Sequence, residues 1–296
     1  TVAIKNYDAW QKLEVKMDTI ASNNEIDTSF ELFGKTFKYP VFAGPVGAVS
    51  QHYSDLYNDN SFNEVYVNAC AKSGIAAFTG DGLNEEIMIQ ATRVIKENEG
   101  VGVPTIKPWD KETCFEKLEL ANESNAFAIA MDIDAAGLPF LQGRIPPAGR
   151  KSEEELKEII DYAKAPFIVK GIMSVEGAQK AINAGAQGIV VSNHGGRVLD
   201  GTPATAAVLE EIADKFKGQV KIFVDGGIRS GLDVFKALAL GADAVIIARP
   251  FVNMIYGAGK EGVEAYVQQL GQELENVMMM TGVSSLKEVS KKNIYK

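Results

Sequence analysis

The chain has 296 residues, of which 46% are hydrophobic and 23% are charged, which is typical of a soluble globular protein. Its formal net charge of −9 argues against nucleic acid and anionic membranes as partners. No apolar run approaches the ~18 residues of a membrane-spanning helix, and the first ten residues lack the apolar core of a signal peptide, so we expect a cytoplasmic protein. The two cysteines, Cys70 and Cys114, have no CxxC spacing and no nearby His, which predicts buried free thiols and no metal site.

Eight short apolar runs recur along the chain, and a helix-like stretch follows each of them. Their continuous apolar character is typical of parallel strands that are buried on both faces. Eight strands alternating with helices, in a chain of this length, predict an α/β fold closed into a single (β/α)8 TIM barrel. The predicted strands cover residues 39–43, 75–79, 103–106, 126–133, 166–170, 188–192, 221–225 and 244–248.

Residues 1–38 precede the first predicted strand and read as a short helix followed by a hairpin-like segment. Segments of this kind often close the bottom of a barrel. No linker rich in Pro, Gly or Ser divides the chain. We therefore predict one domain over residues 1–296, in which residues 1–38 pack on the barrel as an N-terminal extension.

Charged and polar residues directly follow nearly every apolar run. The C-terminal ends of barrel strands meet at one mouth, where the active site of this fold is built. Solvated loop starts alone would give polar residues without this regular placement. The residues in question are Lys107, Asp132, Asp134, Lys170, Ser192, His194, Arg197, Asp225, Arg229 and Arg249.

The last two strand ends predict a phosphate site. Gly226 and Gly227 form a turn that leads into a helix and presents backbone N–H groups, which bind anions. Arg229 or Arg249 can add charge-assisted hydrogen bonds. A tight turn alone would also explain the glycines, but two loops offer the same chemistry where this fold commonly holds a phosphate.

His194 stands between the end of the sixth predicted strand and a Gly-Gly pair, in a setting open to a ligand. A neutral His can act as a general base, and Asp134 is the carboxylate best placed to orient it. Arg197, three residues on, is suited to a substrate carboxylate. His52, the other histidine, lacks such a setting, and we expect it to have a surface or loop role.

Lys170 ends an apolar strand and supports two different chemistries. It can form a Schiff base, as in barrel aldolases, or place a fixed positive charge beside an anionic intermediate. The first favours a lyase and the second an electron-accepting cofactor. Position alone leaves both open.

Three segments, residues 191–200, 224–231 and 248–250, together resemble the FMN-dependent α-hydroxy acid oxidase and dehydrogenase family, which includes glycolate and lactate oxidases. The resemblance is dense from residue 166 to residue 250, and residues 27–48 resemble the family's first-strand region. It implies an FMN-dependent oxidoreductase that oxidises a small 2-hydroxy acid, such as lactate or glycolate, to the 2-oxo acid. It also implies a homo-oligomer, a tetramer or octamer.

The resemblance assigns roles residue by residue. His194 would take a proton from the substrate, Asp134 would hold His194, and Arg197 would bind the substrate carboxylate. Lys170 would stabilise the reduced flavin, which completes the catalytic set. The residues implied to bind FMN are Pro45, Val46, Gly47, Thr79, Lys107, Asp132, Lys170, Ser192, His194, Gly195, Arg197, Asp225, Gly226, Gly227, Arg229, Ala248 and Arg249.

The chain also departs from the family pattern. Asp132 replaces a usual Thr, Lys107 stands in a strand that usually carries Gln, and Ala248 replaces a usual Gly; we expect Lys107 to pair with Asp132. The family's second substrate arginine has no clear counterpart. Only Arg144 and Arg150 are available in the loop after the fourth strand.

Three alternatives remain open at this stage. One is another FMN-dependent barrel reaction, such as an isomerisation resembling that of type 2 isopentenyl diphosphate isomerase. Another is a phosphate-binding barrel lyase without flavin that uses Lys170 as a Schiff-base former. The last is a flavin-binding protein with little catalysis.

Overall fold

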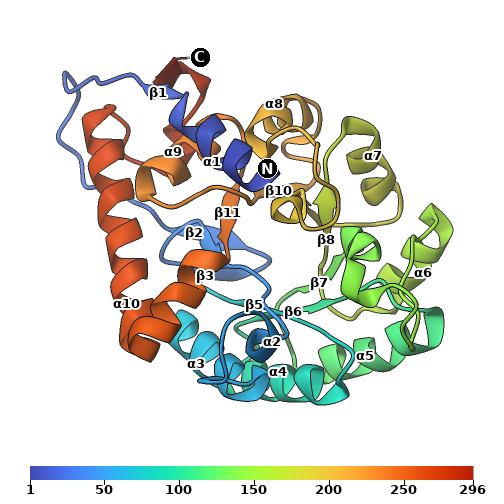
Figure 1. Ribbon diagram of the computed structural model, residues 1–296. Coiled ribbons are helices and arrows are strands. Elements are labelled where there is room, and N and C mark those ends of the chain that lie inside the picture. The colour runs from blue at the N-terminus through green and yellow to red at the C-terminus, as the bar shows by residue number, and fades with distance from the viewer. Residues whose placement is uncertain (296) are drawn as a thin grey trace.

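The computed structural model describes residues 1–295, and eight parallel strands form the centre of the molecule (Figure 1). Neighbouring strands pair in the order β4-β11-β10-β9-β8-β7-β6-β5. A parallel bridge between Ala43 and Ala77 brings the two edges of this sheet together, which nearly closes the predicted (β/α)8 barrel. The strands are β4 (Val41–Ala43), β5 (Phe78–Thr79), β6 (Val103–Ile106), β7 (Ile129–Asp132), β8 (Phe167–Ile172), β9 (Gly188–Val191), β10 (Lys221–Val224) and β11 (Ala244–Ile247).

Helices surround the strands in Figure 1, and several begin at the side-chain caps that their sequences predict. Ser152 accepts a hydrogen bond from the backbone of Glu155, whose side chain accepts one from the backbone N–H of Ser152, and this capping box begins α6. No helix within residues 1–295 is both long and apolar enough to cross a membrane. The helices are α1 (Val2–Gln11), α2 (Val49–His52), α3 (Asp59–Lys72), α4 (Glu85–Glu97), α5 (Lys111–Glu123), α6 (Glu153–Tyr162), α7 (Val175–Asn183), α8 (Thr205–Phe216), α9 (Gly231–Ala239) and α10 (Arg249–Met280).

Aromatic side chains fill the N-terminal half of the barrel interior. Phe42, Phe78 and Phe223 come from β4, β5 and β10 and meet edge to face, with ring centroids 5.8–6.2 Å apart. Phe30 and Phe37 belong to a hairpin formed by β2 (Phe30–Leu32) and β3 (Lys35–Phe37), and both rings pack on Phe42. The hairpin therefore covers this end of the barrel with apolar surface, and the polar residues lie at the opposite end.

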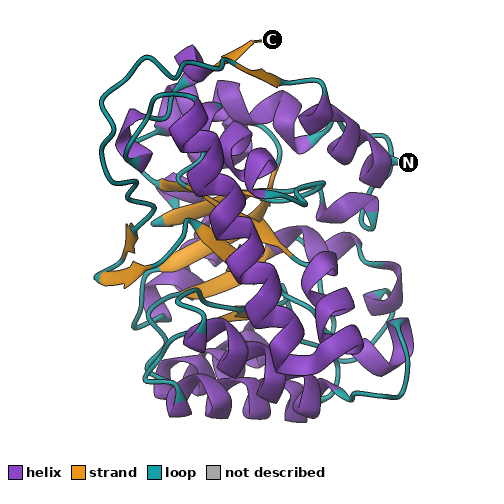
Figure 2. Ribbon diagram, turned by 90° about the vertical axis from the view of Figure 1, so that its left-hand side faces the viewer, coloured by secondary structure: helices purple, strands orange, loops and turns teal. Residues whose placement is uncertain are grey.

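Helix α1 lies at that opposite end, and not at the barrel bottom that segments of this kind often close. The Asn6 side chain exchanges hydrogen bonds with that of Asn193, after β9, and the indole N–H of Trp10 donates to the carbonyl of Gly226, after β10. Figure 2 shows the N-terminus on the right, on the side away from the hairpin. Near the C-terminal end of the described chain, β12 (Ile294–Tyr295) pairs antiparallel with β1 (Glu14–Val15).

Candidate active site

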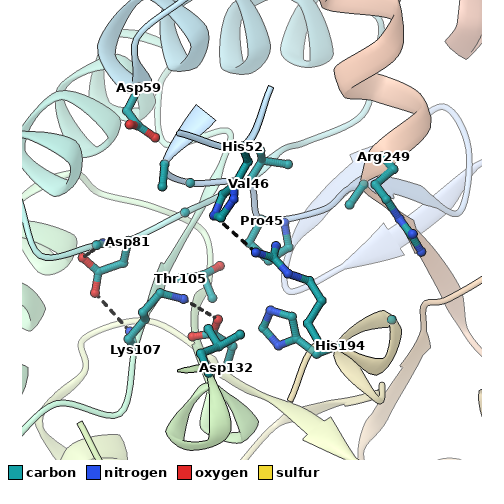
Figure 3. A pocket seen from close by; sticks show the side chains of 18 of the residues that line it. Pro45, Val46, His52, Asp59, Asp81, Thr105, Lys107, Asp132, His194 and Arg249 are labelled. Atoms are coloured by element: carbon teal, nitrogen blue, oxygen red, sulfur yellow. Dashed lines mark hydrogen bonds and ion pairs between the residues drawn. The ribbon is translucent and has the colours of Figure 1, made fainter. Parts of the chain in front are cut away.

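A cavity of about 510 Å³ opens at the C-terminal ends of the strands (Figure 3), which is within the usual size of a small-molecule site. Residues in each of the eight barrel strands, or within three positions after it, line the cavity. The sequence-predicted residues among them are Pro45, Val46, Gly47, Lys107, Asp132, Lys170, His194, Gly195, Arg197, Asp225, Gly226, Gly227, Arg229, Ala248 and Arg249.

Three other predicted residues lie behind this lining. The hydroxyl of Ser192 donates to Oδ2 of Asp225 at 2.9 Å, and Asp134 contacts His194. Thr79 is fully buried, and its hydroxyl has no hydrogen-bond partner within residues 1–295. Ser192 and Asp134 contact residues of the lining and do not line the cavity themselves. Direct contact of Thr79 or Ser192 with a cofactor stays a prediction.

His194 and Asp134 meet as the sequence predicted. Nδ1 of His194 lies 3.1 Å from Oδ1 of Asp134, and His194 lines the cavity. This contact leaves Nε2 as the ring nitrogen that can exchange a proton with a ligand. Burial raises the pKa of Asp134, but the charges of Lys170, His194 and Lys107 outweigh it, so the pKa lies below its ordinary value. Asp134 is therefore an anion that can hold a protonated His194.

Lys170 is a buried cation at the floor of this site, with only 3% of its surface exposed. Its ammonium lies 3.7 Å from Oδ2 of Asp225. Burial lowers the pKa of Lys170, but the carboxylates of Asp134, Asp225 and Asp132 raise it more, so the net shift is upward. A Schiff-base lysine must lose its proton to attack a carbonyl. The arrangement therefore favours the fixed positive charge over the Schiff base.

Lys107 and Asp132 form the expected pair, with Nζ 3.1 Å from Oδ2, and both side chains are buried. The other carboxylate oxygen of Asp132 is buried and has no partner among the described residues. A ligand that enters this corner therefore meets a hydrogen-bond acceptor and an ammonium side by side.

A second buried ion pair supports this corner, and no pattern in the sequence predicted it. Asp81 pairs with Lys117 of α5, and its Oδ2 accepts hydrogen bonds from the indole of Trp109 at 2.6 Å and the backbone N–H of Lys107 at 3.1 Å. Asp81 directly follows Gly80 after β5, so its place at a strand end was the available signal. Lys117 lies within a helix and carried no such signal.

The opposite end of the cavity is built for an anion. Gly226 and Gly227 have φ of +90° and +82°, and a Cβ on Gly227 would lie 2.4 Å from the backbone carbonyl carbon of Asn6, so no larger side chain fits. Burial, and then the like charge of Arg249, lower the pKa of Arg229. Arg249 is also the first residue of α10, at the positive end of the helix dipole. A phosphate here would relieve the repulsion between the two guanidinium groups.

His52 is exposed, as expected for a surface or loop position, and it also lines the cavity, which the sequence did not predict. Its Nε2 lies 3.2 Å from Nη2 of Arg197 (Figure 3). The two residues are 145 positions apart, and no pattern in the sequence connects them. Arg144 and Arg150 do not line the cavity within the described part of the chain.

Two remaining predictions concern the thiols and metals. Cys70 and Cys114 are buried free thiols, as predicted, and burial raises the pKa of Cys114 to about 12. Residues 1–295 contain no group of three or more His, Cys, Asp or Glu side chains arranged to hold a metal ion.

This arrangement fits a flavin nucleotide. The two arginines and the Gly-Gly loop suit its phosphate, the unpartnered buried oxygen of Asp225 suits a ribityl hydroxyl, and Lys170 supplies positive charge where an electron acceptor gains electrons. Fold and site together define a class, the flavin-dependent barrel oxidoreductases.

The family model for FMN-dependent dehydrogenases matches residues 1–142 and 142–296, so the chain belongs to this family, and FMN is its cofactor. A 143-residue stretch is 43% identical to peroxisomal (S)-2-hydroxyacid oxidase GLO4 of Arabidopsis thaliana, over 48% of this chain and 39% of that protein. A 137-residue stretch is 47% identical to L-lactate dehydrogenase of Xanthomonas euvesicatoria pv. vesicatoria (strain 85-10), over 46% of this chain and 35% of that protein. The matches thus span well under half the length of these relatives.

Solved structures agree along almost the whole chain. A putative lactate oxidase of Pediococcus acidilactici is 30% identical, with a TM-score of 0.84 over 99% of this chain and 85% of that one. A mandelate oxidase variant is 25% identical, with a TM-score of 0.84 over 99% and 89% of the two chains. These neighbours share the barrel.

Proposed function

We propose that the chain oxidises a small 2-hydroxy acid to the 2-oxo acid. The observation that carries this proposal is the His194–Asp134 pair, which lies at the same cavity as Lys170 and Arg197. It places a proton acceptor, a carboxylate-binding cation and a buried positive charge around one space. The relatives named as 2-hydroxyacid oxidase and L-lactate dehydrogenase support the substrate class.

The residues divide the work as follows. Arg197 holds the substrate carboxylate through charge-assisted hydrogen bonds. Nε2 of His194 takes a proton from the substrate, and the Asp134 carboxylate stabilises the imidazolium that results. When bound, FMN would supply the acceptor for the α-hydrogen and the two electrons that leave the α-carbon together as a hydride equivalent. Lys170 would hold a protonated ammonium at the same cavity.

The cofactor contacts are part of the same proposal. Arg229, Arg249 and the Gly226–Gly227 loop would hold the phosphate, and Lys107 with Asp132 would face the ring system. The isomerase alternative is not favoured, because the matched family and the named relatives are oxidoreductases. The predicted homo-oligomer stays a prediction, which light scattering of the purified protein tests.

Anaerobic mixing of the FMN-loaded protein with lactate, glycolate and larger 2-hydroxy acids tests the function. We expect at least one of them to bleach the yellow absorption band of the flavin. The same protein should not be bleached by the corresponding 2-methoxy acid, which has no hydroxyl proton to lose. Failure of every 2-hydroxy acid to bleach the flavin contradicts the proposal.

A further inference from the structure

The cavity has an uneven distribution of cations. Arg229 and Arg249 lie at its phosphate end, and Lys107 is paired with Asp132. Arg249 also reaches the loop beside His194, because a Cβ on Gly195 would lie 3.2 Å from its Nη2, but the proposed function assigns Arg249 to the phosphate. Arg197 is the guanidinium of the cavity lining that this assignment leaves for a second anion. A small carboxylate bound beside His194 would therefore have a single arginine, unless another group contributes.

Helix α2 brings His52 to this place. The turn before α2 has Ala48 in the left-handed region, with φ of 54°, and this directs the short helix over the mouth of the cavity. Nε2 of His52 lies 3.2 Å from Nη2 of Arg197, and its ring meets the Phe140 ring edge to face, with centroids 6.0 Å apart. Because a guanidinium only donates hydrogen bonds, Nε2 accepts this one. The His52 ring is therefore neutral while the contact lasts.

The charges around His52 also favour its neutral form. Burial first, and then the positive charge of Arg197, lower the pKa of His52, while Asp59 of α3 opposes them with a smaller effect. His52 thus lies beside a fixed cation and keeps Nε2 unprotonated. An anion placed between the two groups would reverse this balance, because it favours the charged form of His52.

We propose that His52 is the second carboxylate-binding group of the site. A substrate carboxylate takes the place of the direct contact between Arg197 and His52, and His52 takes up a proton as the carboxylate binds. This inference rests on the proposed function for the chemical class of the substrate. It assigns to α2 the role for which Arg144 and Arg150 were the candidates in the sequence.

Oxalate is a suitable probe, because it is a small dicarboxylate without an α-hydrogen and cannot be oxidised in the proposed reaction. Its binding to the FMN-loaded protein is measured by flavin absorbance and by titration calorimetry in two buffers of different ionisation enthalpy. His194 is the other histidine of the cavity lining, so the comparison is made in the His194→Gln background. There we expect uptake of up to about one proton at pH 7.5, and binding that weakens by up to about tenfold per pH unit above it.

Three further variants, each made in the same background, decide whether His52 is responsible. His52→Gln should abolish the proton uptake and flatten the pH dependence. His52→Lys should bind oxalate tightly without proton uptake between pH 6 and pH 8, because its charge is already present. Ser54→Ala, on the exposed segment after α2, should behave like the background.

Equal proton uptake and equal affinity in the His52→Gln variant would overturn the inference, and so would the absence of oxalate binding. The outcome is separate from that of the proposed function. Bleaching by 2-hydroxy acids without His52-dependent proton uptake leaves the function standing and removes the role of His52. His52-dependent oxalate binding without bleaching supports the role of His52 in anion binding and contradicts the proposed function.

Discussion

At the scale of single residues, the site is organised around the charge of Lys170. Asp134, Asp225 and Asp132 surround its buried ammonium, and their combined effect outweighs the cost of burial. Burial raises the pKa of Asp134, and the Lys170 ammonium is the strongest of the effects that lower it. The charge that would assist the cofactor thus also keeps the partner of His194 ionised. This coupling explains why a lysine is tolerated at the end of an apolar strand.

The coupling predicts how stability depends on pH. The raised pKa of Lys170 means that its contribution is complete below the ordinary value of 10.5 and is lost as pH rises through the raised value. The lowered pKa of Asp134 means that its contribution is complete above 3.8 and is lost as pH falls through the lowered value.

Lys170→Met should therefore lower the free energy of unfolding by about 3–5 kcal/mol between these limits, because it leaves buried carboxylates without their cation. Urea unfolding of the apoprotein across pH measures the difference, which should shrink at both extremes. Lys180→Met, at an exposed position of α7, is the control. A loss that does not vary with pH would contradict the coupling.

Asp134→Asn should impair proton removal while the flavin stays bound. The amide cannot stabilise a protonated His194 as a carboxylate does, so we expect flavin reduction by the substrate to slow by about 10²–10⁴-fold. Stopped-flow absorbance under anaerobic conditions gives the rate, and flavin fluorescence gives the FMN affinity. An unchanged reduction rate would show that the contact with His194 has no part in catalysis.

At the scale of elements, strand β8 determines where Asp134 lies. The register of β8 against β9 shifts between Lys170 and Ile172, and Gly171 lies between them with φ of +106°. A Cβ on Gly171 would lie 2.6 Å from Cβ and Cγ of Asp134. The absence of a side chain there lets the carboxylate approach Lys170 and His194.

Gly171→Ala should therefore displace Asp134 and slow flavin reduction, beyond the destabilisation of about 1–2 kcal/mol or more that its backbone conformation alone predicts. Gly185→Ala is a matched control, because Gly185 has a similar φ of +103° and its nearest neighbour would be 3.4 Å away. Both variants should lose stability in thermal melts, and only Gly171→Ala should lose the reaction. Equal reduction rates in the two variants would contradict this role of Gly171.

The elements also show what could be predicted from the sequence. Continuous apolar runs located all eight strands, although β5 is shorter than predicted because Ala77 pairs through a single bridge. Strand ends carry their side chains to a common mouth, so the contacts of His194 with Asp134 and of Lys107 with Asp132 followed from position. His52 and Lys117 reach the site from a loop helix and an outer helix. Their approach depends on loop path and helix packing, which periodicity does not encode.

At the scale of the whole molecule, the two ends of the barrel are chemically different. Phenylalanines and the β2–β3 hairpin cover one end, and the cavity with its charges occupies the other. Helix α1 supports the cavity end from the outside, through Asn6 against the Gly226–Gly227 loop. Because these contacts join residues about 190 to 220 positions apart, the phosphate loop is held by the folded chain as a whole.

Cofactor binding should therefore stabilise the entire fold. FMN at a hundred times its Kd should add about 2.7 kcal/mol to the free energy of unfolding. Riboflavin, which lacks the phosphate, should bind more weakly. Arg249→Met should lower the affinity for FMN and leave that for riboflavin nearly unchanged, as measured by thermal melts and fluorescence titration. Equal losses for both ligands would place the phosphate elsewhere.

The central claim is that His194 removes a substrate proton beside a bound flavin. Anaerobic stopped-flow reduction of the FMN-loaded protein by a 2-hydroxy acid, compared with His194→Gln, tests it most directly. We predict that the wild-type flavin band is bleached. The variant should bind FMN and should be reduced at least about 10²-fold more slowly. Equal rates in both proteins, or no bleaching of the wild type by any 2-hydroxy acid, would contradict it.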